Sequence, residues 1–307
     1  MASQANIDAS VAYLGTPEAL HSLARDPYWP KWDSPWWHMT LLWELGLAAR
    51  IPKATATAMA RSIDEKYPKF FPKTLAELPA GADPHRDIAC HCALGTMFQV
   101  LTATGLDVDR ELPWVRAWFL EYQLPDGGLN CDEAAYSKPV PKSSPLSTLP
   151  PLEAVLFCTP RPFTAEEWAF LDRGAEYLIA HRLVRAASGA GRVIDESWLK
   201  LTFPRFYDYD LLRGLRFLAA WSKARGTAVP GSAVRESLDA LSTRYRDGAL
   251  RVERAAWAEA RTLTVTPEGV WSKADHAADF PLLREAGLIG APAPLLAAHW
   301  AGVLEAF

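Results

Sequence analysis

The sequence predicts an all-α protein, a single (α/α) toroid of about five to six helix pairs in two concentric layers. Three observations support this prediction. Apolar residues recur with helical spacing along most of the 307 residues, whereas alternating strand patterns are scarce. Similar helix starts recur at intervals of 53, 53, 64 and 68 residues. The last helical segment, 294–306, is too apolar to cap an open solenoid, so closure into one ring, a single domain over 1–307, is favoured.

The expected elements follow in chain order. Residues 1–24 are expected to form an N-terminal helix that packs on the ring. Helical periodicity then marks segments 43–49, 93–104, 114–122, 165–181, 211–223, 233–245 and 294–306. Segment 211–223 is apolar on nearly every side and is expected inside, whereas the charged segment 165–181 is expected outside. One short β-ribbon is expected at 261–265.

The repeat predicts where the inner helices begin. Their starts are expected near His38, His91, Ser144, Asp208 and His276. Each unit would consist of an inner helix, a loop, an outer helix and a return loop. The N-termini of the inner helices would converge on one mouth, where their partial positive charges favour anions.

Composition and charge narrow the function. The formal net charge is −4, so no basic excess exists for nucleic-acid binding. No apolar run is long enough to span a membrane and no secretory signal is visible, so a cytoplasmic protein is expected. The four cysteines are then expected as free thiols or metal ligands. The thirteen tryptophans are expected either to fill a large core or to line a cavity for a small, apolar substrate. The sequence also allows the chain to form a homo-oligomer.

Three segments resemble the terpenoid cyclase and protein prenyltransferase superfamily. QLPDGGL at 123–129 resembles the Q-x-x-D-G-G-W repeat of squalene–hopene cyclases, with Leu129 in place of Trp. DIACHCALG at 87–95 resembles an inner-helix segment of prenyltransferase β subunits, where a His binds zinc. FPRFYDYDLLRGL at 203–215 is similar to an inner-helix start of bacterial members. The resemblance covers about residues 25–300 and implies the toroid fold and an isoprenoid-like substrate in an aromatic-lined central cavity.

The first predicted chemistry is protonation of an alkene. Class II cyclases use the central Asp of a D-x-D-D motif, and this chain has only Asp208 and Asp210 in that place, with Tyr207 beside them. These three residues and His91 are the candidate catalytic groups. The alternative is that Asp208 caps its helix. The side chains expected to bind the substrate are those of Trp36, Trp37, His38, Phe206, Tyr209 and Arg213.

The second predicted chemistry is zinc binding, with Cys90, Cys131, Asp132 and His276 as ligands. Consecutive helical residues point about 100° apart, so Cys90, His91 and Cys92 cannot all bind one ion from a regular helix. The family's D-x-C pair is missing. Alternatives are that Cys90 and Cys92 are buried apolar fillers and that Cys131 is a nucleophile beside His91.

An isoprenyl diphosphate would need cations near the mouth, and the candidates are Arg86, Lys142, Arg205 and Arg213. No D-D-x-x-D magnesium motif is present. The leading hypothesis is therefore a cyclase- or prenyltransferase-like enzyme with an isoprenoid-like substrate. Two alternatives stay open: a metal-dependent toroid enzyme with another substrate, and a non-catalytic toroid that binds an apolar ligand or a protein.

Overall fold

The computed structural model describes residues 2–186, 191–257, 262–266, 269–274 and 278–307. Within these ranges the chain is helical, with one two-stranded sheet, so the all-α prediction is confirmed. The first α-helices along the chain are α1 (Gln4–Leu14), α2 (Pro17–Arg25), α3 (Pro35–Glu44), α4 (Lys53–Lys66), α5 (His91–Ala103), α6 (Val108–Glu111) and α7 (Pro113–Glu121). The later ones are α8 (Pro145–Cys158), α9 (Ala165–Ala180), α10 (Leu211–Arg225), α11 (Gly231–Arg244), α12 (Pro281–Ala286) and α13 (Pro294–Ala306). Short 3-10 helices lie at Ala48–Arg50, Leu75–Glu77, Glu133–Ala135 and Glu196–Leu199.

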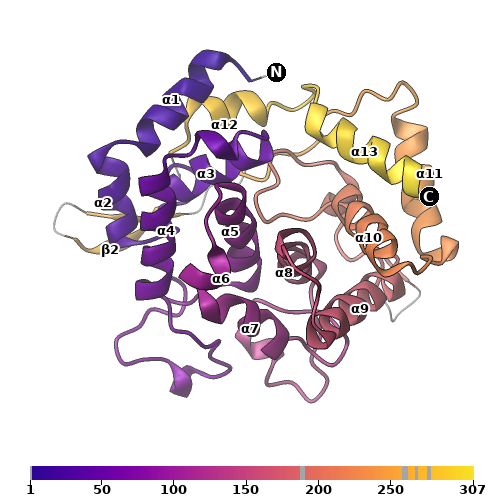
Figure 1. The fold of residues 1–307 in the computed structure, drawn as a ribbon, viewed down its shortest axis with the longest axis horizontal. Coiled ribbons are helices and arrows are strands. Elements are labelled where there is room, and N and C mark those ends of the chain that lie inside the picture. The colour runs from indigo at the N-terminus through magenta and orange to yellow at the C-terminus, as the bar shows by residue number, and fades with distance from the viewer. Residues whose placement is uncertain (1, 187–190, 258–261, 267–268, 275–277) are drawn as a thin grey trace.

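The helices are arranged in two layers. Helices α5, α8 and α10 lie inside an outer row formed by α4, α7, α9 and α11 (Figure 1). Helix α5 packs along α8, while α10 contacts α8 on one side and α13 on the other. Helix α1 packs against both α3 and α12, and α3 packs against α5. The closure of this arrangement into a toroid stays a prediction.

Four of the five predicted inner-helix starts coincide with helix starts in the structure. Helices α3, α5, α8 and α10 begin at Pro35, His91, Pro145 and Leu211. The fifth expected start, at His276, lies outside the described residues, and the next helix along the chain is α12.

Two predicted helices differ from the structure. Residues 1–24 form two helices instead of one, because Pro17 has no backbone N–H and Thr16 caps the second helix by accepting a hydrogen bond from Ala19 N at 3.2 Å. Segment 43–49 is not a continuous helix. Helix α3 ends at Glu44, and Gly46 takes the left-handed φ of 74° that terminates it.

Close backbone contact joins α5 to α8. A Cβ atom on Gly95 would clash with the backbone of Pro150 and Pro151, which lie inside α8. Prolines inside a helix remove two backbone donors, and Gln99 of α5 donates from Nε2 to the oxygens of Gly95 (3.2 Å) and Pro150 (3.4 Å). Glycine at this position therefore sets how closely the two inner helices approach.

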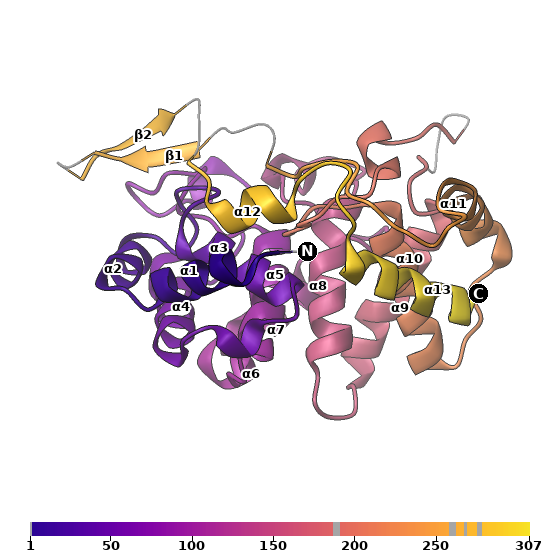
Figure 2. The same ribbon diagram turned by 90° about the horizontal axis from the view of Figure 1, so that it is seen from above.

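The predicted ribbon is present. Strand β1 (Thr262–Val265) pairs antiparallel with β2 (Trp271–Ala274), with Thr262 opposite Ala274 and Val265 opposite Trp271. Seen from above, this ribbon projects from one end of the helical body (Figure 2). Among the described helices, none combines the length and the apolar character needed to cross a bilayer.

Candidate functional site

A cavity of about 230 Å³ lies at the N-terminal end of α5. Its wall comes from the 28–31 loop before α3, the residue that follows α4, the segment leading into α5, and the loop before α10. The lining side chains are Tyr28, Trp29, Lys31, Tyr67, His85, Arg86, Ile88, Cys90, Cys92, Ala93 and Tyr207. Aromatic rings, two thiols and one amine therefore face the same space.

Lys31 is the cation at the centre of this aromatic wall. Its Nζ lies 5.7 Å from the ring centre of Tyr28, 5.5 Å from that of Trp29, 5.9 Å from that of Trp32 and 6.0 Å from that of Tyr207. Within the described part of the chain, no carboxylate forms an ion pair with it. Burial lowers the pKa of the Lys31 amine from its ordinary value, and the neighbouring Cys90 and Cys92 oppose that shift. Ring faces replace the missing counter-ion in part.

Two tyrosine hydroxyls meet beside this amine. Tyr28 Oη donates to Tyr207 Oη at 3.2 Å, and Lys31 Nζ donates to the same Tyr207 oxygen at 3.3 Å. Burial raises the pKa of the Tyr207 hydroxyl, so it keeps its proton at neutral pH. The amine and the two hydroxyls form one chain of polar groups within the aromatic part of the wall.

Three cysteine side chains lie close together at and behind the wall of this cavity. Cys92 Sγ lies 3.6 Å from Cys131 Sγ, and Cys90, which is exposed, lines the cavity with Cys92. Hydrogen bonding with Cys90 and Cys92 lowers the pKa of Cys131 well below its ordinary value, whereas the pKa values of Cys90 and Cys92 are raised. Ser147 Oγ anchors the loop by accepting from Cys131 N at 3.1 Å. A thiolate is the nucleophilic form of cysteine, and the lowered pKa favours that form at Cys131.

The predicted catalytic residue His91 is fully buried and its ring is held on both sides. Trp118 Nε1 donates to Nδ1 at 2.7 Å, so the ring hydrogen belongs on Nε2, which lies 2.9 Å from Tyr136 Oη. Burial lowers the pKa of His91 to about 4. The geometry places this imidazole in the core and does not bring it into the lining of the cavity.

The predicted acids have separate environments. Asp210 is the N-cap of α10, where it accepts from Arg213 N at 2.8 Å, and it also pairs with Arg205. Asp208 forms an ion pair with Arg254 and accepts from Tyr209 N at 2.8 Å. The expected alternative, a cap at Asp208, is wrong, because α10 begins at Leu211 and the residue directly before it is Asp210. Neither acid lines the cavity at α5.

A packed aromatic layer next to the cavity contains the predicted binding residues Trp36, Trp37 and Phe206, and Tyr207, predicted as a catalytic residue, lines the cavity itself. Trp37 packs edge-on against Phe206 with ring centres 5.0 Å apart, and its Nε1 donates to the oxygens of Tyr28 and Pro30. Trp36 is buried in the same layer. Tyr209 is also buried, and its hydroxyl donates to Leu183 O at 2.9 Å.

Two predicted binding residues lie elsewhere in the core. His38 stacks on Phe280 with ring centres 3.6 Å apart. The guanidinium of Arg213 donates to Glu153 at 2.6 and 3.0 Å and to Asp208 O at 2.7 Å. Neither side chain lines the cavity at α5.

The predicted zinc ligands are brought together only in part. Cys90 and Cys131 are close neighbours in the thiol group, but Asp132 uses its carboxylate to accept from Ala134 N at 3.0 Å. His276 lies outside the described residues. In the part of the chain that the structure describes, no three His, Cys, Asp or Glu side chains are arranged to hold a metal ion.

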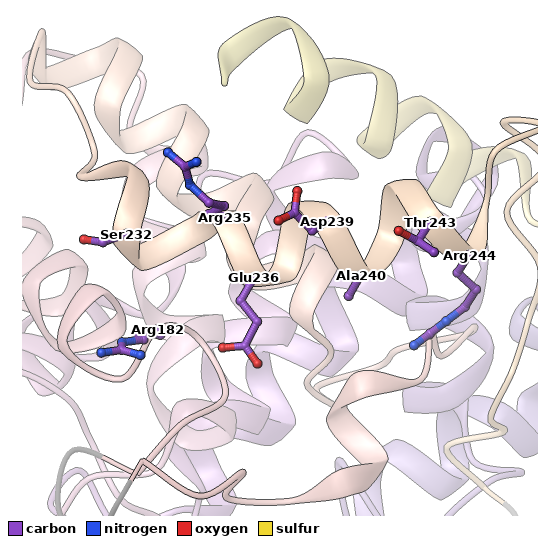
Figure 3. Close-up of a pocket in the computed structure, with 8 residues that line it drawn as sticks. All are labelled: Arg182, Ser232, Arg235, Glu236, Asp239, Ala240, Thr243 and Arg244. Carbon is purple, nitrogen blue, oxygen red and sulfur yellow. The ribbon is translucent and has the colours of Figure 1, made fainter.

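Sequence reasoning missed Lys31 and Tyr28. The signal was the segment 26–33, in which tryptophans and prolines surround one lysine, a pattern equally typical of an ordered loop. A surface hollow of about 1050 Å³ lies along α11, where the side chains point to different sides of the helix (Figure 3). Its lining is almost wholly exposed, and Glu236 and Arg244 pair with Arg185 and Glu253. This hollow has no group of convergent reactive side chains.

Comparison of the chain with protein-family models, with curated proteins and with solved structures returned no match.

Proposed function

We propose that this chain is a small-molecule enzyme whose active site is the cavity at the N-terminal end of α5. The substrate is a compact, apolar, isoprenoid-like molecule with one anionic end. The observation that carries the proposal is the half-buried amine of Lys31, without a carboxylate partner among the described residues, in a cavity whose lining also contains aromatic rings, the thiols of Cys90 and Cys92, and Arg86, which is paired with Asp87. Apolar walls with a few convergent polar groups are typical of ligand sites.

The aromatic wall supports the substrate class. Four rings already surround one positive charge at Lys31, and the same ring faces would stabilise positive charge on a reacting allylic carbon. The volume of about 230 Å³ is small for a ligand pocket, which favours a short isoprenoid unit over a long chain.

Lys31 supports the anionic end. Without a carboxylate partner among the described residues, its ammonium group would gain most from a phosphate or carboxylate group of the substrate. Tyr207 Oη, at 3.3 Å from the amine, is in reach of the same group and would donate a second hydrogen bond. Together they would orient the apolar part of the substrate along the rings.

The thiols supply the reactive atoms. Cys131 carries the lowered pKa but does not line the cavity; its sulfur lies 3.6 Å from that of Cys92, which does, so negative charge on Cys131 would act on the substrate through Cys92. The free state of all four cysteines suits a reducing compartment, and we place the protein in the cytoplasm. Closure of the two helix layers into a toroid would supply the rigid scaffold.

A zinc-dependent enzyme is the second candidate. The sulfur separation of 3.6 Å is close to the edge of about 3.8 Å that two thiolates span on a tetrahedral zinc ion with bonds of about 2.3 Å. Cys92 and Cys131 would be two of the ligands, and a bound ion would lower the pKa of a coordinated thiol or water. Elemental analysis of protein purified without a metal-affinity step tests this: about one zinc per chain, lost in Cys131→Ser, supports it, and no zinc rejects it.

The proposed function is tested with dimethylallyl, geranyl and farnesyl diphosphate as probes. Binding is followed by calorimetry and products by mass spectrometry. We expect the shorter diphosphates to bind wild type, Lys31→Met to lose at least ten-fold in affinity, and Cys131→Ser to bind but lose turnover. Lys69→Met, at an exposed lysine paired with Asp64, is the matched control, and Cys158→Ser is the control thiol. Equal binding by Lys31→Met and wild type would contradict the proposal, and binding without any turnover would favour a non-catalytic binding protein.

A further inference from the structure

A second cavity, of about 180 Å³, lies among α3, α8, α10 and α13, apart from the cavity at α5. Its lining consists of Trp43, Glu44, Gly46, Glu153, Phe203, Arg205, Arg213, Arg216, Leu295 and His299. Three guanidinium groups thus face one small space inside a helical protein. Buried positive charges are unfavourable unless carboxylates or other acceptors neutralise them.

Two of the three guanidinium groups are neutralised by carboxylates. Arg205 donates to both oxygens of Asp210, from Nε at 3.0 Å and from Nη2 at 3.2 Å. Arg213 donates to Glu153 Oε2 from Nε at 3.0 Å and from Nη2 at 2.6 Å. All four side chains are buried, so these two pairs form the fixed base of the cavity.

The third guanidinium group, Arg216, has spare donors. Its Nη1 lies 3.6 Å from Glu153 Oε1, a carboxylate that already serves Arg213, and no hydrogen bond joins Arg216 to another described side chain. The ring centre of Phe157 lies 4.4 Å from Cζ of Arg216, a cation–π contact that uses none of its N–H donors. About a third of the side chain is exposed, so the cavity communicates with solvent on this side.

His299 adds a further donor. Arg205 Nη1 donates to its Nδ1 at 3.1 Å, so the ring hydrogen belongs on Nε2. Burial and the three nearby arginines lower the pKa of His299 to about 2, and the imidazole is therefore neutral. Its free N–H and the edge of Arg216 come from two neighbouring helices, α13 and α10.

Glu44 is the remaining acid in the lining. Its Oε2 accepts from Arg205 N at 2.6 Å, and burial raises its pKa to about 7. At neutral pH this carboxyl group is therefore only partly ionised. Three arginines then face Glu153, Asp210 and a fraction of a third negative charge, which leaves the cavity with an excess of positive charge.

We infer that this cavity is a binding site for a small oxyanion, a phosphate or carboxylate group, held by Arg216 and His299. Spare N–H donors and excess positive charge are what such a group requires, and the fork of an arginine side chain matches two of its oxygens. A volume of about 180 Å³ is large enough for inorganic phosphate or a small carboxylate. The site is separate from the cavity of the proposed function and does not depend on it.

Calorimetric titration at pH 7 tests the inference, with sodium phosphate, sodium acetate and, at matched ionic strength, sodium chloride as probes. We expect phosphate or acetate to bind with one site per chain, and the tighter of the two identifies the source of the oxyanion. Arg216→Gln and His299→Gln should each weaken binding at least ten-fold. Arg225→Gln, on the same helix but paired with Asp172, should bind like wild type. Equal heats from chloride, or unchanged affinity in a folded Arg216→Gln protein, would overturn it.

Discussion

The indole nitrogen of Trp118 donates a hydrogen bond to Nδ1 of His91 at 2.7 Å. The opposite ring nitrogen lies 2.9 Å from Tyr136 Oη, whose hydroxyl donates to Tyr122 O at 3.0 Å. The imidazole is therefore a link between a tryptophan and two tyrosines in the core.

His91→Ala should lower the free energy of unfolding by about 2–4 kcal/mol, because the Trp118 and Tyr136 groups lose their partner in a buried space. Urea denaturation measures this loss. His21→Ala, at an exposed position, is the control and should change stability by less than about 0.5 kcal/mol. A His91→Ala protein as stable as wild type but without turnover would instead make this residue catalytic.

His38 should make the protein less stable in acid. Burial lowers its pKa in the folded chain to about 3, below the ordinary 6.5, so the unfolded chain binds a proton first as pH falls. The contribution of neutral His38 to the free energy of unfolding is fully present above about pH 6.5 and is lost progressively as the pH falls below that value. Compared with His38→Leu, wild type should lose about 2 kcal/mol between pH 7 and pH 5. Parallel curves of unfolding free energy against pH for the two proteins would refute this.

Gly95 should tolerate no larger side chain. Gly95→Ala places a methyl group against the backbone of Pro150 and Pro151, which cannot move aside without separating α5 from α8. We expect a loss of about 1–3 kcal/mol in the free energy of unfolding. Gly302→Ala, in the open on α13, should instead gain about 0.5–1 kcal/mol, because alanine favours a helix. We therefore expect the free energy of unfolding to fall in Gly95→Ala and to rise in Gly302→Ala. A change of the same sign in both variants would disprove the close contact between Gly95 and α8.

Cys131 should react with iodoacetamide at pH 7 at least about ten-fold faster than Cys158. The pKa of Cys131 is lowered by Cys90 and Cys92, whereas burial raises the pKa of Cys158 to about 11. Peptide mapping by mass spectrometry measures both rates in the same sample. The two cysteines should react at similar rates in guanidinium chloride, and similar rates in the folded protein would count against a thiolate at Cys131.

Local patterns in the sequence predicted much of the fold. Apolar spacing identified the inner helices, and prolines mark where α3 and α8 begin, because proline fits the first turn of a helix. The ribbon at β1 followed from alternation and a turn signal. The same patterns failed at the ends of elements: Thr16 with Pro17 divides the N-terminal helix, and Gly46 ends α3 early.

The candidate site likewise contains residues that the sequence predicted and residues that it did not. Tyr207 and Cys90 were predicted from residue type and position, and both line the cavity at α5. The role of Lys31 could not be predicted, because it depends on Tyr207 lying within 3.3 Å although 176 residues separate the two. Likewise Asp208 and Asp210 are chemically alike, and only the helix start at Leu211 decides which of them is the cap.

The sequence by itself determined the helical class, the order of the elements and the residue types available for chemistry, because these follow from periodicity and composition within short windows. Tertiary structure alone decided which of those residues meet. In the folded chain His91 lies in the core, Lys31 lines the aromatic cavity at α5, and Arg216 lines the charged cavity between α8, α10 and α13. Burial and neighbouring charge set the protonation and reactivity of a side chain, and both arise only when distant segments pack together.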